Sequence, residues 1–305
     1  MRLNYTFFVA LFLVSSFTLT AQDEPASPWK TGGEVGVTFF QSAFTNWTDG
    51  GGDNTTSLGA LFNYFAKYKK DKTSWTNTAL LQYGLQRVGN DADFVKSVDR
   101  IELLSVAGLY AVDNFDYSML FSLKTQLTAS RTATGAIQSN FFAPGEILLA
   151  PGIKYHKGDK KTKDNILINF SPATAKFLVV ANDSIANAGT FTGVPGEKFR
   201  TEFGASLIGN YRINFLEQEN AKGTWTTALE LFSNYLENPE DVDIKWTNIL
   251  AFNLLKYFTV TFTTDLRYDA QVAVPVDRDN DGVFESTGPR VRFAQTVGLG
   301  FGYKF

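Results

Sequence analysis

An acidic stretch at residues 277–285 is the part of this sequence whose residue types and spacing best suit metal binding. It reads Asp-Arg-Asp-Asn-Asp-Gly-Val-Phe-Glu, with carboxylates at its first, third and fifth positions and a glycine at its sixth. This spacing matches calcium-binding loops, in which a tight turn at glycine brings carboxylates and a backbone carbonyl onto one hard cation. The ligands that we predict for a structural calcium ion are Asp277, Asp279, Asp281, the carbonyl of Val283, and Glu285.

A second interpretation of this stretch stays open. In a full EF-hand loop the twelfth position holds a glutamate that binds calcium through both oxygens, whereas this chain has Gly288 there. The stretch would then be a solvated acidic turn. Under both interpretations it lies in a surface loop, where an ion would stiffen the loop and take no part in catalysis. No other cofactor is predicted.

Few other residues suggest chemistry. The chain has no cysteine, which excludes disulfides and thiolate metal sites. Its only histidine is His156, and the sequence indicates no serine or acid that would complete a nucleophilic triad with it. Lysine and arginine number 28 against 31 aspartate and glutamate residues, so a basic surface for nucleic acid is not expected. We therefore predict no catalytic residues.

Alternation of apolar and polar residues is the strongest structural signal. From Val291 to Phe305, one set of alternate positions is apolar and aromatic, and the other is small, polar or charged. Successive side chains of a strand point to opposite faces, so this segment predicts a strand with one apolar and one wet face. Its 15 residues exceed the length of an ordinary globular strand, about 3–10 residues. Such a strand suits a wall between lipid and water.

About twelve segments share this character. Connections after even-numbered segments are mostly short and those after odd-numbered segments are mostly long, which is the asymmetry of outer-membrane barrels with their long loops outside. We predict an all-β protein, a transmembrane antiparallel up-and-down β-barrel, with a soluble β-sandwich as the competing fold. Pro172 predicts a bulge or kink in the seventh segment. The predicted strands are 32–44, 55–69, 73–87, 98–111, 115–128, 146–156, 165–180, 199–213, 224–236, 242–254, 257–270 and 291–305.

The beginning of the chain predicts export. Arg2 precedes an apolar run from Phe7 to Leu19, and Ala21 follows it, as in a secretory signal peptide. The run is shorter than the ~20 residues that a membrane-spanning helix needs. We predict a signal peptide at 1–21, a periplasmic lead at 22–31 and the barrel at 32–305, located in the outer membrane.

Three stretches carry a resemblance to a known family. They are residues 41–51 (QSAFTNWTDGG), residues 170–177 (FSPATAKF), and residues 231–239 (LFSNYLENP), the last continuing to Trp246. They are similar to a family of outer-membrane β-barrel proteins from Gram-negative bacteria that is known only as a domain of unknown function. The resemblance extends over nearly all of the mature chain and implies an outer-membrane protein. It implies no activity, ligand or functional residue.

Charged residues on the polar faces of the strands form a second candidate site. On the predicted register they point into the barrel, and bases modestly outnumber acids. One interpretation is a water-filled pore with a weak preference for anions. The other is a barrel closed by its own ion pairs. The residues that we predict to line the lumen are Lys124, Arg200, Glu202, Glu230, Lys245, Asp265, Arg267 and Arg292.

Three functions are compatible with these features, in order of preference. The first is a passive pore for small polar solutes. The second is a closed barrel that serves as a scaffold or accessory subunit of an outer-membrane complex. The third is an outer-membrane enzyme, which the lone histidine disfavours. The expected partners are outer-membrane lipid, small polar solutes and other outer-membrane proteins, and nucleic acid is not among them.

Limited proteolysis can test whether the acidic stretch binds calcium. Calcium should protect residues 271–290 from protease, and Asp279→Ala should remove this protection because it deletes one of the converging carboxylates. The fragments are identified by mass spectrometry with and without a chelator. If calcium gives the unmodified protein no protection, the stretch is only an acidic turn.

Overall fold

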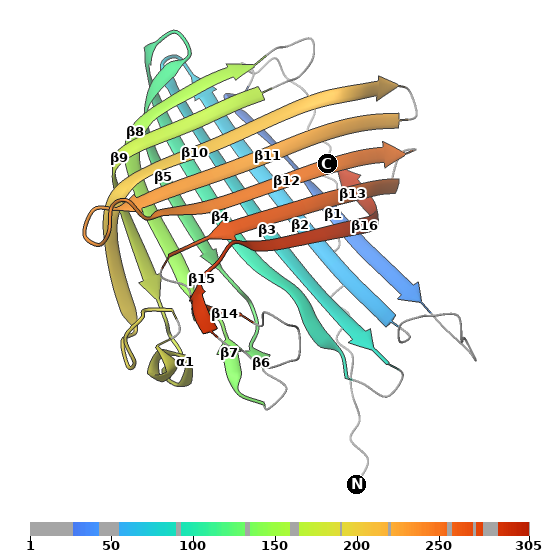
Figure 1. Cartoon of the computed structure of the whole chain (residues 1–305). Coiled ribbons are helices and arrows are strands. Elements are labelled where there is room, and N and C mark those ends of the chain that lie inside the picture. Colours follow the sequence, from blue (N-terminus) through green and yellow to red (C-terminus); the bar gives the residue numbers. More distant parts are fainter. Residues whose placement is uncertain are drawn as a thin grey trace.

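In a computed structural model, the chain forms a closed barrel of twelve antiparallel strands (Figure 1). The structure describes residues 27–42, 55–89, 93–131, 135–158, 165–189, 191–218, 221–254, 258–270, 273–276 and 286–304. Each barrel strand pairs with the next one along the chain, and β1 pairs with β16, which confirms the predicted up-and-down topology. The barrel strands are β1 (Trp29–Ser42), β2 (Thr55–Lys70), β3 (Thr73–Val88), β4 (Val95–Val112), β5 (Phe115–Thr125), β8 (Gly145–Gly158), β9 (Asn165–Val179), β10 (Phe199–Gln218), β11 (Ala221–Asn234), β12 (Val242–Leu254), β13 (Phe258–Tyr268) and β16 (Arg292–Lys304).

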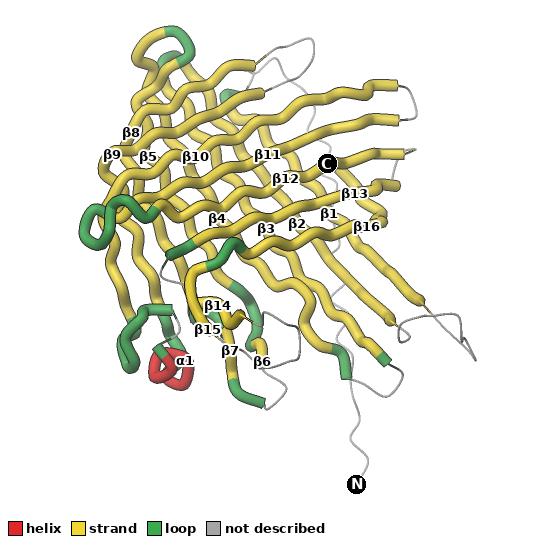
Figure 2. The backbone as a smooth tube through the Cα atoms, in the orientation of Figure 1, coloured by secondary structure: helices red, strands yellow, loops and turns green. Residues whose placement is uncertain are grey.

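The long loops at one end of the barrel contain short strands and a short helix. Between β5 and β8, β6 (Ser130–Arg131) pairs with β7 (Ile137–Ser139). Between β13 and β16, β14 (Ala273–Val276) pairs with β15 (Ser286–Pro289). The helix α1 (Asp183–Ala188) lies between β9 and β10, and Figure 2 shows it beside these ribbons, below a wall made of strand.

Tight turns join strands at the opposite end. Residues 71–72 connect β2 to β3, and residues 113–114 connect β4 to β5. Asp71 has a φ of 48° and Asn114 a φ of 66°, in the left-handed region that Asp and Asn enter more readily than other non-glycine residues. These short turns alternate with the long loops, as the sequence predicts.

The outer surface of the barrel is apolar. On β16, Phe293, Val297, Leu299 and Phe301 point away from the interior and expose between 51% and 70% of their surface. A continuous apolar surface of this extent is unfavourable in water, whereas acyl chains accept it. The exterior therefore has the character of a membrane-spanning wall.

Aromatic side chains pair near both ends of this wall. Such rings prefer the level where lipid headgroups meet the hydrocarbon. The pairs form two aromatic girdles. Near the short turns they are Trp29–Tyr68, Trp29–Trp75, Phe115–Tyr155 and Phe258–Phe301, and near the long loops they are Phe177–Phe199 and Phe203–Tyr235.

The predicted irregularity around Pro172 is confirmed. The register of β9 shifts against β8 between Leu149 and Ile153, and against β10 between Gly204 and Ser206. At the same level β10 and β11 approach closely, because a Cβ atom on Gly204 would lie only 1.8 Å from the carbonyl oxygen of Ser233. Glycine is therefore the residue that fits here.

Most predicted strand boundaries differ from the structure by a few residues, and two of the differences change the assignment of a connecting segment. The turn predicted at 214–223 is wrong, because β10 continues to Gln218 and β11 begins at Ala221. A register shift between Asn214 and Leu216 interrupts the alternation, which hides this part of the strand from the sequence pattern. β1 begins at Trp29, within the stretch predicted as a lead, while residues 1–21 of the predicted signal peptide lie outside the described residues.

The wall closes through a short seam between its first and last strands. β1 pairs with β16 only from Glu34–Lys304 to Thr38–Gly300. By contrast, β1 pairs with β2 along its whole length, from Trp29–Tyr68 to Ser42–Thr55. The first and last strands are thus joined by the shortest register in the barrel.

The close approach at Gly204 predicts a specific loss of stability. Gly204→Ala should lower the free energy of unfolding by at least about 2 kcal/mol, because the new methyl group must displace backbone atoms of β11. Urea titration in lipid vesicles is the measurement. Gly209→Ala is the matched control on the same strand, since its Cβ atom would lie 4.0 Å from the nearest atom, the Leu229 oxygen. Equal losses for both variants would contradict the close approach.

Candidate functional site in the barrel interior

Contacts across the barrel show which side chains point inward. Lys124 on β5 lies within hydrogen-bond distance of Glu230 on β11, although β8, β9 and β10 separate these strands in the sheet. This contact passes through the interior, so Lys124 and Glu230 both face inward. Every second residue before and after them on the same strand faces inward too, and register partners on neighbouring strands share that face. Lys245 on β12 is the register partner of Glu230 and shares its face.

Four inward side chains form a cluster of alternating charge, which we call the central cluster. Lys124 Nζ lies 2.6 Å from Glu230 Oε2 and 3.8 Å from Glu146 Oε1. Lys245 Nζ lies 2.8 Å from Glu146 Oε1 and 3.1 Å from Glu230 Oε1. Each ammonium contacts both carboxylates, so the charges balance where water is scarce.

A second ionic group lies nearer the long loops. Lys176 on β9 contacts Glu202 on β10 at 2.8 Å and Asp243 on β12 at 3.1 Å. Arg200 Nε lies 3.1 Å from Glu202, and its Nη2 lies 3.3 Å from Glu237 in the connection after β11. These contacts join β9, β10 and β12 from the inside.

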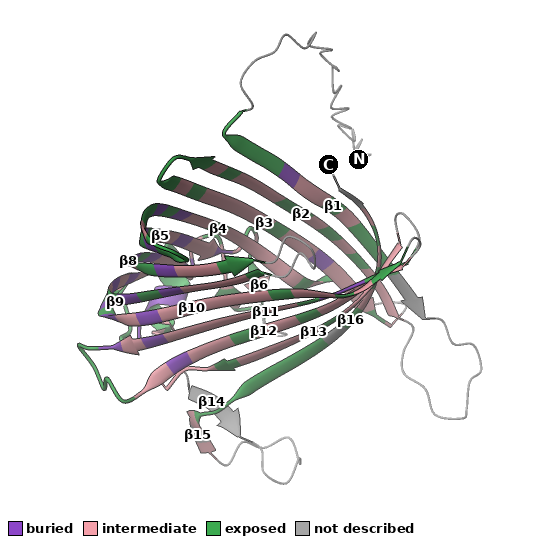
Figure 3. Cartoon of the chain, turned by 90° about the horizontal axis from the view of Figure 1, so that it is seen from above, coloured by how far each residue is buried: buried purple, intermediate pink, exposed green. Residues whose placement is uncertain are grey.

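Apolar side chains fill the interior on the other side of the central cluster. Val106, Leu120, Leu148 and Ala150 are each exposed by 5% or less, and Ile208 packs against them. These residues lie on β4, β5 and β8, and Ile208 lies on β10. This part of the interior is packed, and buried residues accordingly concentrate around β4, β5, β8 and β9 in Figure 3.

His156 belongs to a polar group near the short turns. Its Nε2 atom lies 3.4 Å from Asp116 Oδ1, and Asp116 Oδ2 lies 2.7 Å from Lys154 Nζ. The Lys154 ammonium also donates a hydrogen bond of 2.9 Å to the Ser74 hydroxyl. The Ser74 hydroxyl in turn donates a hydrogen bond of 3.3 Å to Asp116 Oδ2. Gly108 leaves the space for the group, because a Cβ atom there would lie 2.5 Å from Lys154 Nζ.

The remaining wall, formed by β1, β2, β3, β13 and β16, is lined differently. Its inward positions include small residues such as Gly36, Thr38 and Gly300, while Asn63 and Lys67 are exposed. On neighbouring β12, inward Ile249 keeps 37% of its surface exposed. Water therefore reaches this side of the interior, which we call the wet side.

Several bases of the interior have no acidic partner. Within the described part of the chain, no carboxylate lies at ion-pair distance from Lys67, Arg212, Arg267 or Arg292. The acids of the central cluster and of the second ionic group are all paired. Two inward acids of the wet side, Glu34 and Asp265, also have no ion pair among the described residues. The four bases outnumber them, so the unpaired charge of these residues is positive on balance.

The structure brings together five of the residues predicted to line the lumen. Lys124, Glu230 and Lys245 belong to the central cluster. Arg200 and Glu202 belong to the second ionic group. Their inward charges bind one another, which is the closed arrangement that the sequence left as an alternative to an open pore.

The other predicted residues do not join these groups. Asp265 accepts a hydrogen bond of 2.6 Å from the Thr247 hydroxyl. Arg267 and Arg292 are register partners at the long-loop end, where both are exposed.

The predicted calcium ligands at 277–285 lie outside the described residues. The described residues contain no group of three or more His, Cys, Asp or Glu side chains that could hold a metal ion. No helix in the described part of the chain is long and apolar enough to cross a membrane.

Three acids of these ionic groups, Asp116, Glu146 and Asp243, were not among the predicted lining residues. Asp243 precedes Lys245 by two positions, so strand alternation alone places it on the same face. Glu146 likewise shares the parity of Lys154 on β8. Asp116 shares the parity of Lys124 on β5 in the same way.

Two long loops pack against each other beside the ends of β8 and β9. Ala143, Val180, Ile185 and Ala186 form a small core in which every residue is exposed by 2% or less. Asn182 begins α1 by accepting a hydrogen bond of 3.2 Å from the Ile185 backbone. The loop before β8 and the loop after β9 therefore form one packed unit.

Comparison with known proteins supports the resemblance to a family. Residues 39–130 match the model of a family described as "Protein of unknown function (DUF3078)", which confirms the predicted resemblance for that part of the chain. No curated protein matches the sequence.

Solved barrels share the fold at low similarity. The COG4313 outer membrane channel from Pseudomonas putida F1 is 11% identical with a TM-score of 0.41, and the match covers 94% of this chain and 100% of the channel. The translocator domain of the autotransporter NalP from Neisseria meningitidis is 11% identical with a TM-score of 0.36, covering 93% and 90%. The β domain of the Bordetella autotransporter BrkA is 8% identical with a TM-score of 0.34, covering 91% and 99%. This likeness is too low to support an argument about function.

The central cluster predicts a stability effect that depends on charge balance. Lys245→Met leaves two carboxylates to one lysine and should lower the free energy of unfolding by about 1–3 kcal/mol. The loss should stay below the ~3–5 kcal/mol of a fully buried pair, because 30% of the Lys245 side chain is exposed. Adding Glu146→Gln should restore part of the loss, measured as a double-mutant cycle in urea. Additive losses would show that the two side chains do not interact.

Proposed function

We propose that this protein is an outer-membrane barrel through which small polar solutes pass passively, with a weak preference for anions. Its apolar exterior with two aromatic girdles supports the location in a membrane. Closure of the sheet supports it too, because the hydrocarbon offers no partner for a free strand edge.

The observation that carries this proposal is the unequal pairing of inward charges. The central cluster and second ionic group use their acids in ion pairs, whereas Lys67, Arg212, Arg267 and Arg292 have no described acidic partner. A passage along the wet side would thus present a positive lining. Separate bases at several heights would attract an anion weakly at each place and release it again, as conduction requires.

A closed barrel that serves as a scaffold is the second candidate. The packed apolar residues and the central cluster favour it, since they fill one side of the interior. Other outer-membrane proteins would be its partners. A structural calcium ion at 277–285 and the absence of a catalytic role complete the proposal and remain predictions.

Ion selectivity in planar bilayers tests the pore. The substitution Lys67→Glu changes the charge of the lining by two units. The interaction energy with an ion about 10 Å away in water changes by about 0.8 kcal/mol, so the permeability of cations relative to anions should rise about fourfold. Reversal potentials across a salt gradient measure this shift. The matched control is Lys70→Glu, which makes the same charge change further along β2 on the opposite face.

The outcomes separate the two candidates. A shift with Lys67→Glu and none with Lys70→Glu supports a pore along the wet side. Equal shifts reject that placement. An unmodified protein that inserts but shows no conductance overturns the pore and favours the scaffold.

A further inference from the structure

A row of polar side chains crosses the lipid-facing surface of the barrel. Thr227 on β11 is the register partner of Asn248 on β12, which is the partner of Thr264 on β13, which is the partner of Gln295 on β16. On each of these strands the inward residues are the direct chain neighbours of the residue in this line, so all four side chains of the line point outward. We call this line the polar row.

The polar row lies inside the apolar band rather than at its edge. Each strand that contributes to it carries an apolar outward residue two positions before and two positions after. These neighbours are themselves in register and form an apolar row on each side. The row nearer the long loops is Leu229, Trp246, Leu266 and Phe293, and the row nearer the short turns is Trp225, Leu250, Phe262 and Val297.

Most of the polar row lacks hydrogen-bond partners. The Thr227 hydroxyl accepts a hydrogen bond of 2.8 Å from Trp246 Nε1. Asn248, Thr264 and Gln295 make no side-chain hydrogen bond to any residue that the structure describes. Acyl chains cannot supply partners, so an unbonded amide is unfavourable at this depth.

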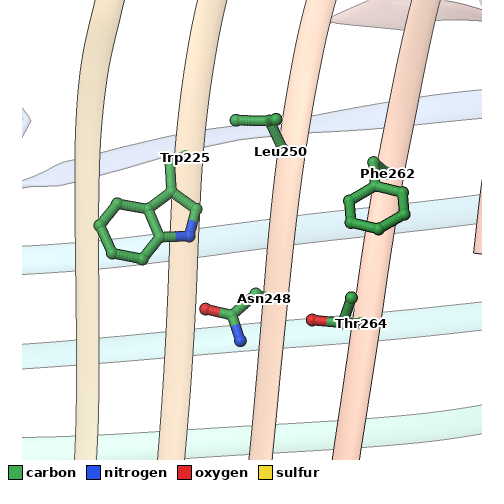
Figure 4. Close-up of a pocket in the computed structure, with 5 residues that line it drawn as sticks. All are labelled: Trp225, Asn248, Leu250, Phe262 and Thr264. Atoms are coloured by element: carbon green, nitrogen blue, oxygen red, sulfur yellow. The ribbon is translucent and has the colours of Figure 1, made fainter. Parts of the chain in front are cut away.

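A hollow lies against the polar row. It has a volume of about 300 Å³ and is lined by Trp225, Asn248, Leu250, Phe262 and Thr264. Figure 4 shows Asn248 and Thr264 side by side, with Trp225, Leu250 and Phe262 on one side of them. A surface that combines an apolar hollow with hydrogen-bonding groups suits a protein side chain better than an acyl chain.

We propose that the polar row is a contact surface between two copies of this chain in the membrane. Copies inserted in the same direction are related by an axis along the membrane normal, which brings equal depths together. Because barrel strands are tilted, the two polar rows cross at the axis, and the residues beside the axis meet at similar depths. Amide groups both donate and accept hydrogen bonds, so the row is complementary to itself.

Two-fold symmetry gives the contact a definite pattern. With the axis between β12 and β13, Asn248 faces Thr264 of the partner subunit, and the reverse contact forms at the same time. The Asn248 amide thereby gains a partner at a depth where lipid offers none.

Asn77 provides an internal comparison. It is also an outward amide, on β3, but it lies two positions from the girdle residue Trp75 and pairs with Ser105 in the register. Headgroups and water reach that level. Asn77 therefore needs no second protein, and substitutions there serve as the matched control.

Cysteine cross-linking tests the pattern directly, because the chain has no cysteine of its own. Asn248→Cys and Thr264→Cys variants of the full chain are produced together and oxidised in isolated outer membranes. A disulfide between the two variants is expected, and Asn77→Cys should form none. A monomeric unmodified protein, equal cross-linking through Asn77→Cys, or capture of a different protein at the row would each overturn the proposal.

A second measurement addresses the hydrogen bonds. The Asn248→Leu variant keeps its new side chain in lipid, so the barrel should fold, and its heat-sensitive migration in gels reports whether it does. Each membrane hydrogen bond contributes about threefold in affinity, and the contact between Asn248 and Thr264 forms twice, so dimerisation in nanodiscs should weaken about tenfold. Asn77→Leu should leave dimerisation unchanged. A folded Asn248→Leu variant that dimerises like the unmodified protein would contradict the inference.

Discussion

The structure depends on one constraint, which is that a backbone polar group surrounded by hydrocarbon must find its partner within the protein. A sheet satisfies this requirement only when its last strand returns to its first, and here β16 pairs with β1. Alternation follows from the same closure, because a closed sheet has one face towards lipid and one towards its own interior. The apolar outer wall and the charged interior are two results of a single geometry.

The interior answers a second requirement, which is that charges taken from water be balanced. On the packed side each lysine of the central cluster contacts both of its glutamates, and the acids of the neighbouring group are also paired. On the wet side the exposed bases are solvated instead. The barrel is thus asymmetric across its width. Ion pairs and apolar packing fill the interior on one side, and water reaches the interior on the other.

Most of the fold was accessible to sequence reasoning because alternation is a local signal. All twelve barrel strands coincide with predicted segments, and β12 matches its predicted bounds of 242–254. Errors arose where alternation fails, as at the irregular register near Leu216. The candidate site was less accessible. Strand parity points Lys124 and Glu230 inward, but no local pattern tells which inward residues meet across the barrel, because that depends on how the walls bend. This is why Glu146 and Asp116 were missed.

The short seam has a consequence for how the barrel is made. Fewer backbone hydrogen bonds join β1 to β16 than join any other neighbouring pair in the described wall, since their register extends only from Glu34 to Thr38. These two strands are also the farthest apart along the polypeptide, so loop-closure entropy disfavours their meeting until the rest of the sheet exists. Biogenesis should therefore end at this seam, with a curved open sheet as the last intermediate, and mechanical rupture of the finished cylinder should begin there.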